Sequence, residues 1–162
     1  SNLYHSTALS DVSAIEEIIG TLAVAMRNVK DENGIPMGYI ADTIVVPGNR
    51  AKLETALKKV VGSERTAGSS NNDINTQYGG YNIIVLPYWQ AEEDKFIMMS
   101  SDANKNLGGN LFFDRANLAV RADVDHLSGN LQWVGRGRFG LGFGTWKHMI
   151  LAQTTAEGTS IT

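Results

Sequence analysis

The sequence of 162 residues lacks cysteine altogether and has few of the other residues that carry catalysis. The absence of cysteine excludes disulfides, thiol catalysis and thiolate metal sites. The three histidines, His5, His126 and His148, do not have the spacing of metal ligands, so we expect no metal site. No G-x-S-x-G nucleophile motif occurs. We therefore expect no catalytic residue, no bound cofactor and no enzymatic activity.

Long apolar runs and an excess of positive charge are also missing. No apolar run is long enough to span a bilayer, and no segment resembles a signal peptide, so we expect no membrane partner. The net charge of −3 argues against a dedicated nucleic-acid binder.

The composition is that of a globular protein, with 43% apolar and 19% charged residues, and the length suits one domain. We expect a tag or leader in residues 1–8, an α+β domain in residues 9–152 and a polar tail in residues 153–162. The chain opens on Ser1 and Asn2 without an initiator methionine, and we interpret it as a piece of a longer protein.

Two segments have the apolar periodicity of helices. In the segment 12–28, apolar residues recur at steps of three and four, which predicts a helix with one buried face: Val12, Ile15, Ile19, Leu22 and Met26. A β-branched run at Thr43–Val46 predicts a strand that Pro47 ends. A second helix follows, with Leu53, Leu57, Val60 and Val61 on one face and Gly62 at its end.

The second half of the chain has the pattern of strands. We predict strands from Tyr81 to Pro87 and over "KFIMMS" from Lys95, and a turn at "NKNLGGN". In 117–125, apolar and polar residues alternate, which predicts a half-buried strand. A long, bent strand is expected over 131–144. The fold class is therefore α+β, with a mixed or antiparallel sheet, two main helices and long bent C-terminal strands.

The stretch "GRGRFGLGFGTW" contains G-x-G-x-x-G at Gly135, Gly137 and Gly140, the spacing of a dinucleotide-binding turn. That turn must follow a strand and open a helix, and no helical periodicity follows here. At period two, the stretch instead places apolar residues on one face: Leu131, Trp133, Phe139, Leu141 and Phe143. Glycines inside a strand mark bends or a close neighbour, so we interpret the stretch as structural.

Charged residues outside the core have two interpretations each. Arg136 and Arg138 share one face of the predicted strand, where they are solvated, contact another subunit or, less favoured, bind nucleic acid. The cluster Glu92, Glu93 and Asp94 has the residue types of paired catalytic carboxylates, but a solvated turn is the favoured interpretation.

The order of these segments resembles the C-terminal half of the major capsid proteins of tailed bacteriophages. In that family, phrases like "IVVPGNRAKLETAL" and "NIIVLPYW" belong to the axial domain, which the resemblance places at about residues 12–115. The run "LAVRADVD…GNLQWVGRGRFGLGFGTWKHMILA" resembles the long strands of the peripheral domain and a closing strand, at about residues 116–152. The extended arm, extended loop and spine helix that begin such proteins have no counterpart before Leu9.

The resemblance implies a capsid fold of the Hong Kong 97 type and a structural role. The chain would be a subunit of a phage or prophage head, self-associating into capsomers around double-stranded DNA, with scaffold and portal proteins as further partners. Its location would be the virion, and the host cytoplasm during assembly.

The segment from Gly62 to Gly80 is almost free of apolar residues and longer than most connections. We expect it to be mobile, and the resemblance matches it to the tip of the axial domain. Tyr78 and Tyr81 would then contact another subunit or pack within the chain. The alternative function is a non-viral α+β binding module that uses this loop for recognition. A small nucleotide-dependent enzyme is a third class.

Overall fold

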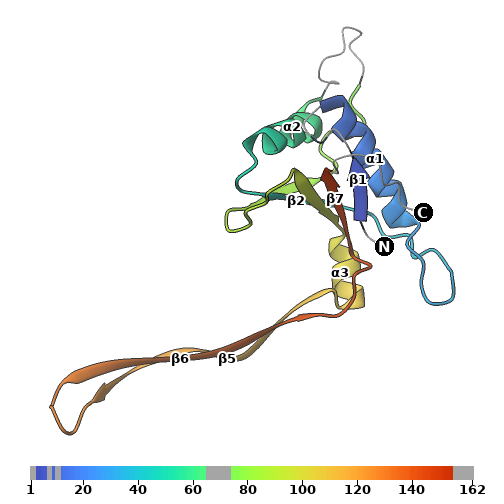
Figure 1. Ribbon diagram of the computed structural model, residues 1–162. Coiled ribbons are helices and arrows are strands. Elements are labelled where there is room, and N and C mark those ends of the chain that lie inside the picture. Colours follow the sequence, from blue (N-terminus) through green and yellow to red (C-terminus); the bar gives the residue numbers. More distant parts are fainter. Residues whose placement is uncertain (1–2, 7–8, 10–11, 65–73, 155–162) are drawn as a thin grey trace.

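The computed structural model of the chain describes residues 3–6, 9, 12–64 and 74–154. A five-stranded sheet and two helices form the main body, which we call the α/β domain, and a two-stranded ribbon protrudes from it (Figure 1). The helices are α1 (Val12–Arg27), α2 (Ala51–Gly62) and α3 (Ser101–Leu107). The strands are β1 (Leu3–Ser6), β2 (Thr43–Pro47), β3 (Asn82–Leu86), β4 (Lys95–Met99), β5 (Asn110–Val124), β6 (Leu131–Phe143) and β7 (Met149–Thr154).

The sheet of the α/β domain is mixed, as the sequence predicts. Its strand order is β1-β7-β4-β2-β3. The outer pairs β1/β7 and β2/β3 are parallel, whereas β4 pairs antiparallel with both β2 and β7. The α+β fold class is therefore confirmed.

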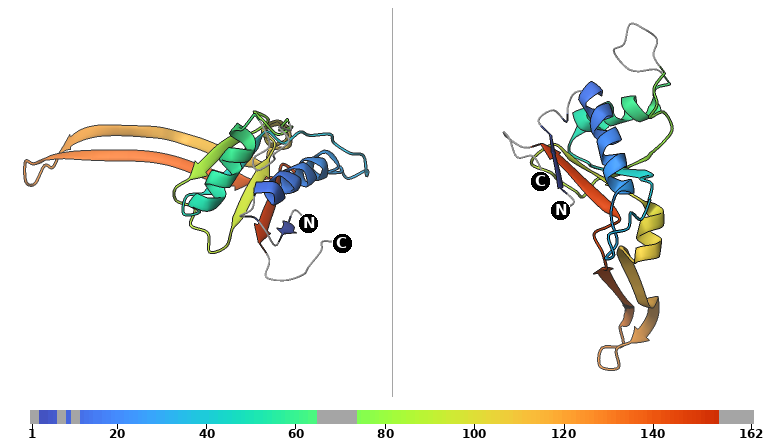
Figure 2. Two further views of the ribbon diagram at one scale, coloured as in Figure 1. Left: turned by 90° about the horizontal axis from the view of Figure 1, so that it is seen from above. Right: turned by 90° about the vertical axis from the view of Figure 1, so that its right-hand side faces the viewer.

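The core of the α/β domain lies between the sheet and the two long helices (Figure 2). The period-two residues Ile44 and Val46 of β2, and Phe96 and Met98 of β4, are fully buried there. The predicted apolar stripes of both helices meet them, with Ile15, Ile19, Leu22 and Met26 from α1 and Leu53, Leu57, Val60 and Val61 from α2. Helical periodicity thus correctly identified the buried faces.

Both ends of the sheet region differ from the sequence prediction. Residues 1–8 are predicted to be a leader, but Leu3–Ser6 forms β1 and pairs in parallel with β7. The polar tail is predicted to begin at residue 153, but β7 continues to Thr154. The backbone hydrogen bonds of β1 come from pairing with a strand more than 140 residues away in sequence. A strand of four residues has too short a pattern to be predicted from sequence.

The turn predicted at "NKNLGGN" is wrong, because α3 covers most of it. The Ser100 hydroxyl accepts a hydrogen bond from the Ala103 N–H at 3.3 Å and caps the helix. Gly108 ends it in the left-handed conformation (φ 62°). Only Ala103 of α3 is buried, so the helix has no apolar stripe that its sequence could reveal. The capping residues Ser100 and Gly108 were the only features from which this helix could be predicted.

The half-buried strand predicted over 117–125 is also wrong in its burial. It is part of the longer β5, whose residues are all exposed, and its partner is β6 alone. The predicted division at about residue 116 falls inside β5, and the closing strand β7 returns to the main sheet. The alternation of apolar and polar residues identified which side of the strand is apolar, but it did not show whether another part of the molecule covers that side.

Candidate interaction surface

The ribbon formed by β5 and β6 is the most distinctive surface of the molecule. It extends away from the α/β domain, beyond α3, and ends in a turn at 125–130 (Figures 1 and 2). The 13 residues of β6 span about 40 Å. Two register shifts leave one extra residue each in β5, between Asp114 and Ala116 and between Ala116 and Ala119. Such bulges bend a strand pair, which accounts for the curve of the ribbon.

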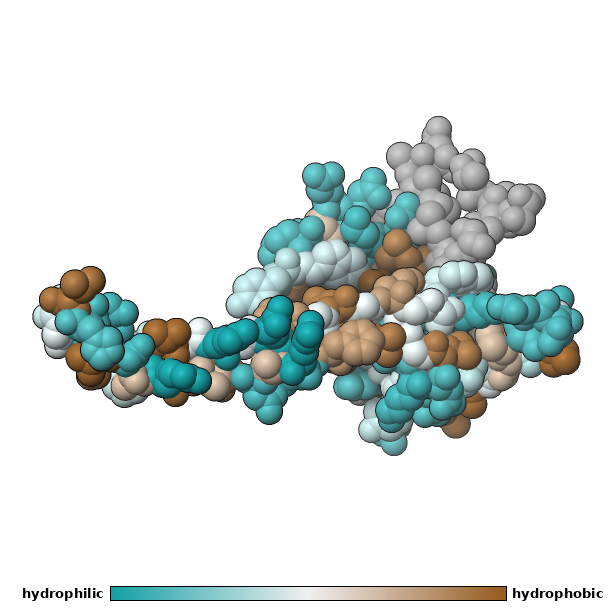
Figure 3. Space-filling view, turned by 90° about the horizontal axis from the view of Figure 1, so that it is seen from below, coloured by the Kyte–Doolittle hydropathy of each residue, from teal (hydrophilic) through white to brown (hydrophobic). Residues whose placement is uncertain are grey.

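One side of the ribbon, which we call the apolar face, carries large hydrophobic side chains along its length. The register pairs Phe112 with Leu141 and Val124 with Leu131, so these residues share a side. All the members are exposed: Phe112, Leu118, Val120, Val124, Leu131, Trp133, Phe139, Leu141 and Phe143. Trp133 is 70% exposed and Phe139 73%. Brown, hydrophobic atoms recur along the ribbon out to its tip in Figure 3.

The side chains of the apolar face contact one another but leave their outer surfaces open. The rings of Phe112 and Phe139 stack with centroids 6.1 Å apart. Leu118 reaches across to β6, where a Cβ on Gly137 would lie 3.7 Å from its Cδ1. A two-stranded ribbon is marginally stable in water by itself, and a contiguous exposed apolar surface marks a contact site. The apolar face therefore has the properties of a surface that a partner covers.

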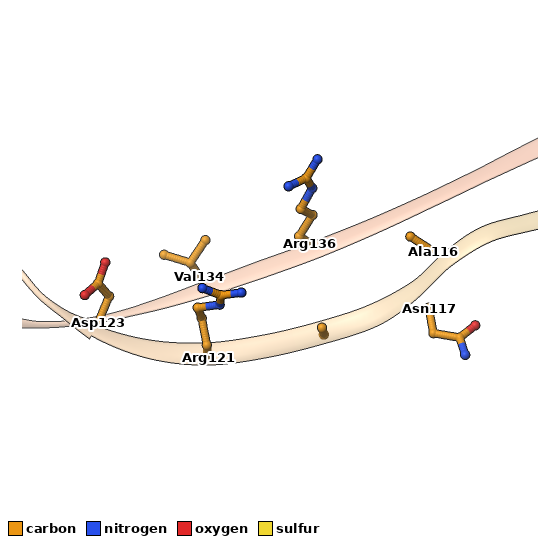
Figure 4. Close-up of a pocket in the computed structure, with 7 residues that line it drawn as sticks. Ala116, Asn117, Arg121, Asp123, Val134 and Arg136 are labelled. Atoms are coloured by element: carbon orange, nitrogen blue, oxygen red, sulfur yellow. The ribbon is translucent and has the colours of Figure 1, made fainter.

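The opposite side of the ribbon, which we call the arginine face, is polar toward the tip. Arg121, Asp123, Val134 and Arg136 project to the same side, whereas Asn117 points the other way (Figure 4). These residues, with Ala116 and Ala119, line a shallow hollow of about 510 Å³. Arg138 follows Arg136 on the same side of β6 and pairs with Ala116. Toward the base this side is apolar, with Leu111 and Phe113 opposite Gly142 and Gly140.

The tip of the ribbon is a tight turn with a defined conformation. The Asp125 carboxylate accepts hydrogen bonds from the Ser128 hydroxyl and the Leu127 N–H, and these lower the pKa of Asp125 below its usual range. Gly129 has a φ of 69°, which favours glycine. The turn holds Leu127 outward with 98% of its surface exposed, so the tip also presents an apolar group.

The base of the ribbon closes around a buried histidine. Its two strands leave the α/β domain where Gly108 and Gly109 meet Gly144, and a Cβ on Gly144 would lie 2.1 Å from the Gly108 carbonyl oxygen. His148 is fully buried below this crossing, with its ring 5.6 Å from that of Phe143. Neither ring nitrogen has a hydrogen-bond partner of good geometry within the described residues. Burial lowers the pKa of His148, and the Thr145 backbone offsets part of that shift.

The predicted contact residues lie in two separate regions. Arg136 and Arg138 are on the ribbon, as the alternating pattern of 131–144 predicts. Tyr78 and Tyr81 belong to the segment between α2 and β3, at the other end of the molecule (Figure 1). The Tyr78 side chain is 55% exposed. Tyr81 packs against the core, and burial raises the pKa of its hydroxyl although Arg27 lies close enough to lower it.

The long segment 62–80 is anchored at both of its described ends. Residues 65–73 lie outside the described part, so its expected mobility is untested there. Asn75 is buried, and its side-chain amide donates to the carbonyl oxygens of Val60 and, at 2.7 Å, Ser63. Gly79 N–H donates to Val61 at 2.9 Å. The end of α2 is thus tied to the start of β3.

The other candidate chemistry of the sequence has a structural explanation. The G-x-G-x-x-G glycines lie inside β6 instead of a strand-to-helix turn. Asp94 pairs with Arg50, with 3.6 Å between Oδ1 and Nε, while Glu92 and Glu93 are exposed in the same turn. Within residues 3–6, 9, 12–64 and 74–154, no group of three or more acidic or histidine side chains has a metal-binding arrangement. No helix in the described part of the chain is long and apolar enough to cross a membrane.

The sequence signal for the apolar face was found in 131–144, but the alternation did not show that this face is exposed. Trp133, Phe139 and Leu141 alternate as predicted, but they face outward and not into the α/β domain. The residues of β5 nearest the base, Leu111, Phe112 and Phe113, were missed. Their run of three apolar residues has no alternation, because both sides of the ribbon are apolar at its base.

Comparison with solved structures shows that a phage protein has a similar fold. No protein-family model matches the sequence, and no curated protein matches it. Among solved structures, the chain is similar to a protein of Mycobacterium phage Che8, with a TM-score of 0.54 and 15% sequence identity. The similarity covers 93% of this chain and 52% of the phage protein, so the chain spans about half of its length. The chain therefore has a phage-related fold.

Proposed function

We propose that this protein is a structural subunit of a phage or prophage head shell, which self-associates into capsomers that enclose double-stranded DNA. The single observation that carries the proposal is the free-standing ribbon with an exposed apolar face. A contiguous apolar surface is unfavourable in water, so its exposure favours association with a partner. The fold shared with a phage protein supports a role in the virion.

The composition of the ribbon supports a protein partner. Trp, Phe and Arg are enriched where interfaces derive most of their binding energy. The ribbon places Trp133 and Phe139 on one side and Arg136 on the other. On this proposal the role is structural and not enzymatic. Its further partners would be the scaffold protein, the portal protein and the packaged DNA. The protein would lie in the host cytoplasm during assembly and in the virion afterwards.

Electron microscopy of the natural gene product that carries this sequence, expressed with any scaffold protein encoded beside it, tests the proposal. We expect closed shells. The double variant Trp133→Ser with Phe139→Ser should fold but form none, because both changes remove apolar surface from the apolar face.

The matched control is Tyr88→Ser with Ile40→Ser, which changes two exposed apolar residues of the α/β domain. The control should still assemble. Absence of any particle from the wild type, or shells from the ribbon variant as abundant as those of the control, would contradict the proposal.

A further inference from the structure

The arginines of the ribbon have no ionic partner in the described part of the chain. The ion pairs there are Arg50–Asp94 and Lys58–Glu54, and both lie in the α/β domain. Arg136 and Arg138 stand opposite alanines, Ala119 and Ala116. Because alanine is short, these pairings leave open space beside the two arginine side chains, and the hollow of the arginine face occupies part of it.

The basic residues of the ribbon are all arginines. The ribbon, residues 110–143, contains four arginines and no lysine, although the chain as a whole has seven lysines. The planar guanidinium donates two parallel hydrogen bonds to a carboxylate or a phosphate, which an ammonium group cannot do. The arginine face is therefore suited to bind an anionic group.

The distribution of charge indicates which anion. The ribbon carries four arginines and three aspartates, a net charge of +1. Since the whole chain carries −3, the remaining residues carry −4. A nucleic acid requires a continuous cationic surface, but Asp123 ends the row of arginines near the tip and the rest of the chain would repel a polyanion. Protein carboxylates fit this mixed surface better.

We propose that the arginine face of the ribbon binds carboxylates on the α/β domain of a second copy of this chain. This inference rests on the proposed self-association and adds its geometry. Two arginine faces repel each other, so the contact joins different surfaces of the two copies. Contacts of this head-to-tail kind generate rings and extended lattices, whereas a self-complementary contact closes at a dimer. The apolar face supplies binding energy, and the arginine face sets the orientation.

The test compares two charge-reversal variants with the same net charge. Arg136→Glu with Arg138→Glu changes the arginine face. Lys52→Glu with Lys59→Glu changes exposed residues of α2 and is the matched control. Sedimentation velocity over a concentration series, at low and high salt, measures self-association of each protein.

We expect the ribbon variant to associate about tenfold or more weakly than the wild type at low salt, and the control to associate at least as well as the wild type. High salt should weaken the wild type toward the ribbon variant, because screening removes the same interaction. Equal effects in both variants would mean simple charge repulsion and would overturn the inference. Unchanged association of the ribbon variant would also overturn it.

Two further results separate the inference from the proposed function. If the wild type associates and only Trp133→Ser with Phe139→Ser weakens it, self-association stands and the arginine contact is wrong. If the wild type does not associate at any concentration, both are wrong. Binding of a DNA duplex that Arg136→Glu with Arg138→Glu abolishes, with association intact, would assign the arginine face to nucleic acid instead.

Discussion

At the scale of single residues, His148 is a polar side chain that is fully buried. Its imidazole is buried where α3, the ribbon base and β7 meet, and the Ser100 N–H at the cap of α3 donates to its backbone oxygen at 3.0 Å. A Cβ on Gly109 would lie 2.5 Å from its Nδ1, so the close packing leaves space only for glycine at position 109. The neutral ring fits this site, and a protonated ring would bury a charge.

The burial of His148 predicts a pH dependence of stability. Because its pKa is lower in the folded than in the unfolded chain, the unfolded state binds the proton more readily. Its stabilising contribution is complete above the ordinary histidine pKa of 6.5 and is lost as the pH falls through the lower folded value. Urea midpoints measured across this range should decrease toward acid, and His148→Gln should flatten that decrease. A wild-type midpoint that is constant across this range would contradict the assignment.

The carboxylate of Asp42 predicts a separate loss of stability at lower pH. Burial raises the pKa of Asp42, but hydrogen bonds from the Ser101 hydroxyl and N–H outweigh it, so the pKa is lowered. Stability from Asp42 is present above the ordinary value of 3.8 and is lost as the pH falls through the lower folded value. We expect Asp42→Asn to reduce the slope only in that acid range, in the same urea titration. A reduced slope near pH 6.5 would instead implicate the His148 environment.

The space around the glycines of β6 predicts how a side chain at these positions affects folding and association. A Cβ on Gly140 would have no atom within 4 Å, so Gly140→Val should change the unfolding free energy of the isolated chain by less than ~0.5 kcal/mol. If a second copy approaches there, the same change should reduce association. Thermal melting and sedimentation of the same variant measure the two effects. Gly142→Val is the comparison, because its Cβ would lie 3.2 Å from the Phe113 ring within the chain.

At the scale of elements, the ribbon and the sheet strands have similar patterns and opposite environments. Phe139 is 73% exposed on β6, whereas Phe96 of β4 is fully buried. Phe139→Ala should therefore cost less than about 1 kcal/mol of unfolding free energy in the isolated chain, while Phe96→Ala should cost ~3–5 kcal/mol. Denaturant titration of both variants measures the difference. Equal costs would mean that the apolar face is already covered within one chain.

The prediction of elements from sequence succeeded where an element has a long periodic pattern. The helices α1 and α2 and the strands β2, β3, β4 and β6 agree with it within a few residues. The strand β1 and the helix α3 were missed because β1 depends on pairing with the distant β7, and α3 on its caps. Neither kind of stabilisation leaves an apolar period in the sequence.

At the scale of the whole molecule, the α/β domain has its own core and the ribbon contributes nothing to it. The core cluster contains residues of α1, α2, β2, β4 and β7, and none from the ribbon. A chain in which residues 112–141 are replaced by a short Asn-Gly turn should therefore keep its fold but remain a monomer. Circular dichroism and sedimentation measure the two properties. Self-association equal to that of the whole chain would show that the ribbon is not the contact.

The sequence by itself determined the α+β class, the buried faces of α1 and α2, and a strand at about 131–144 with one apolar side. Periodicity encodes these features because side-chain direction follows from local backbone geometry. Only the tertiary structure decided that β5 and β6 pair with each other and leave the domain, so that Trp133 and Phe139 face solvent and not the core. An alternating pattern is the same whether a core or a partner covers its apolar side, and only the arrangement of the whole chain distinguishes the two.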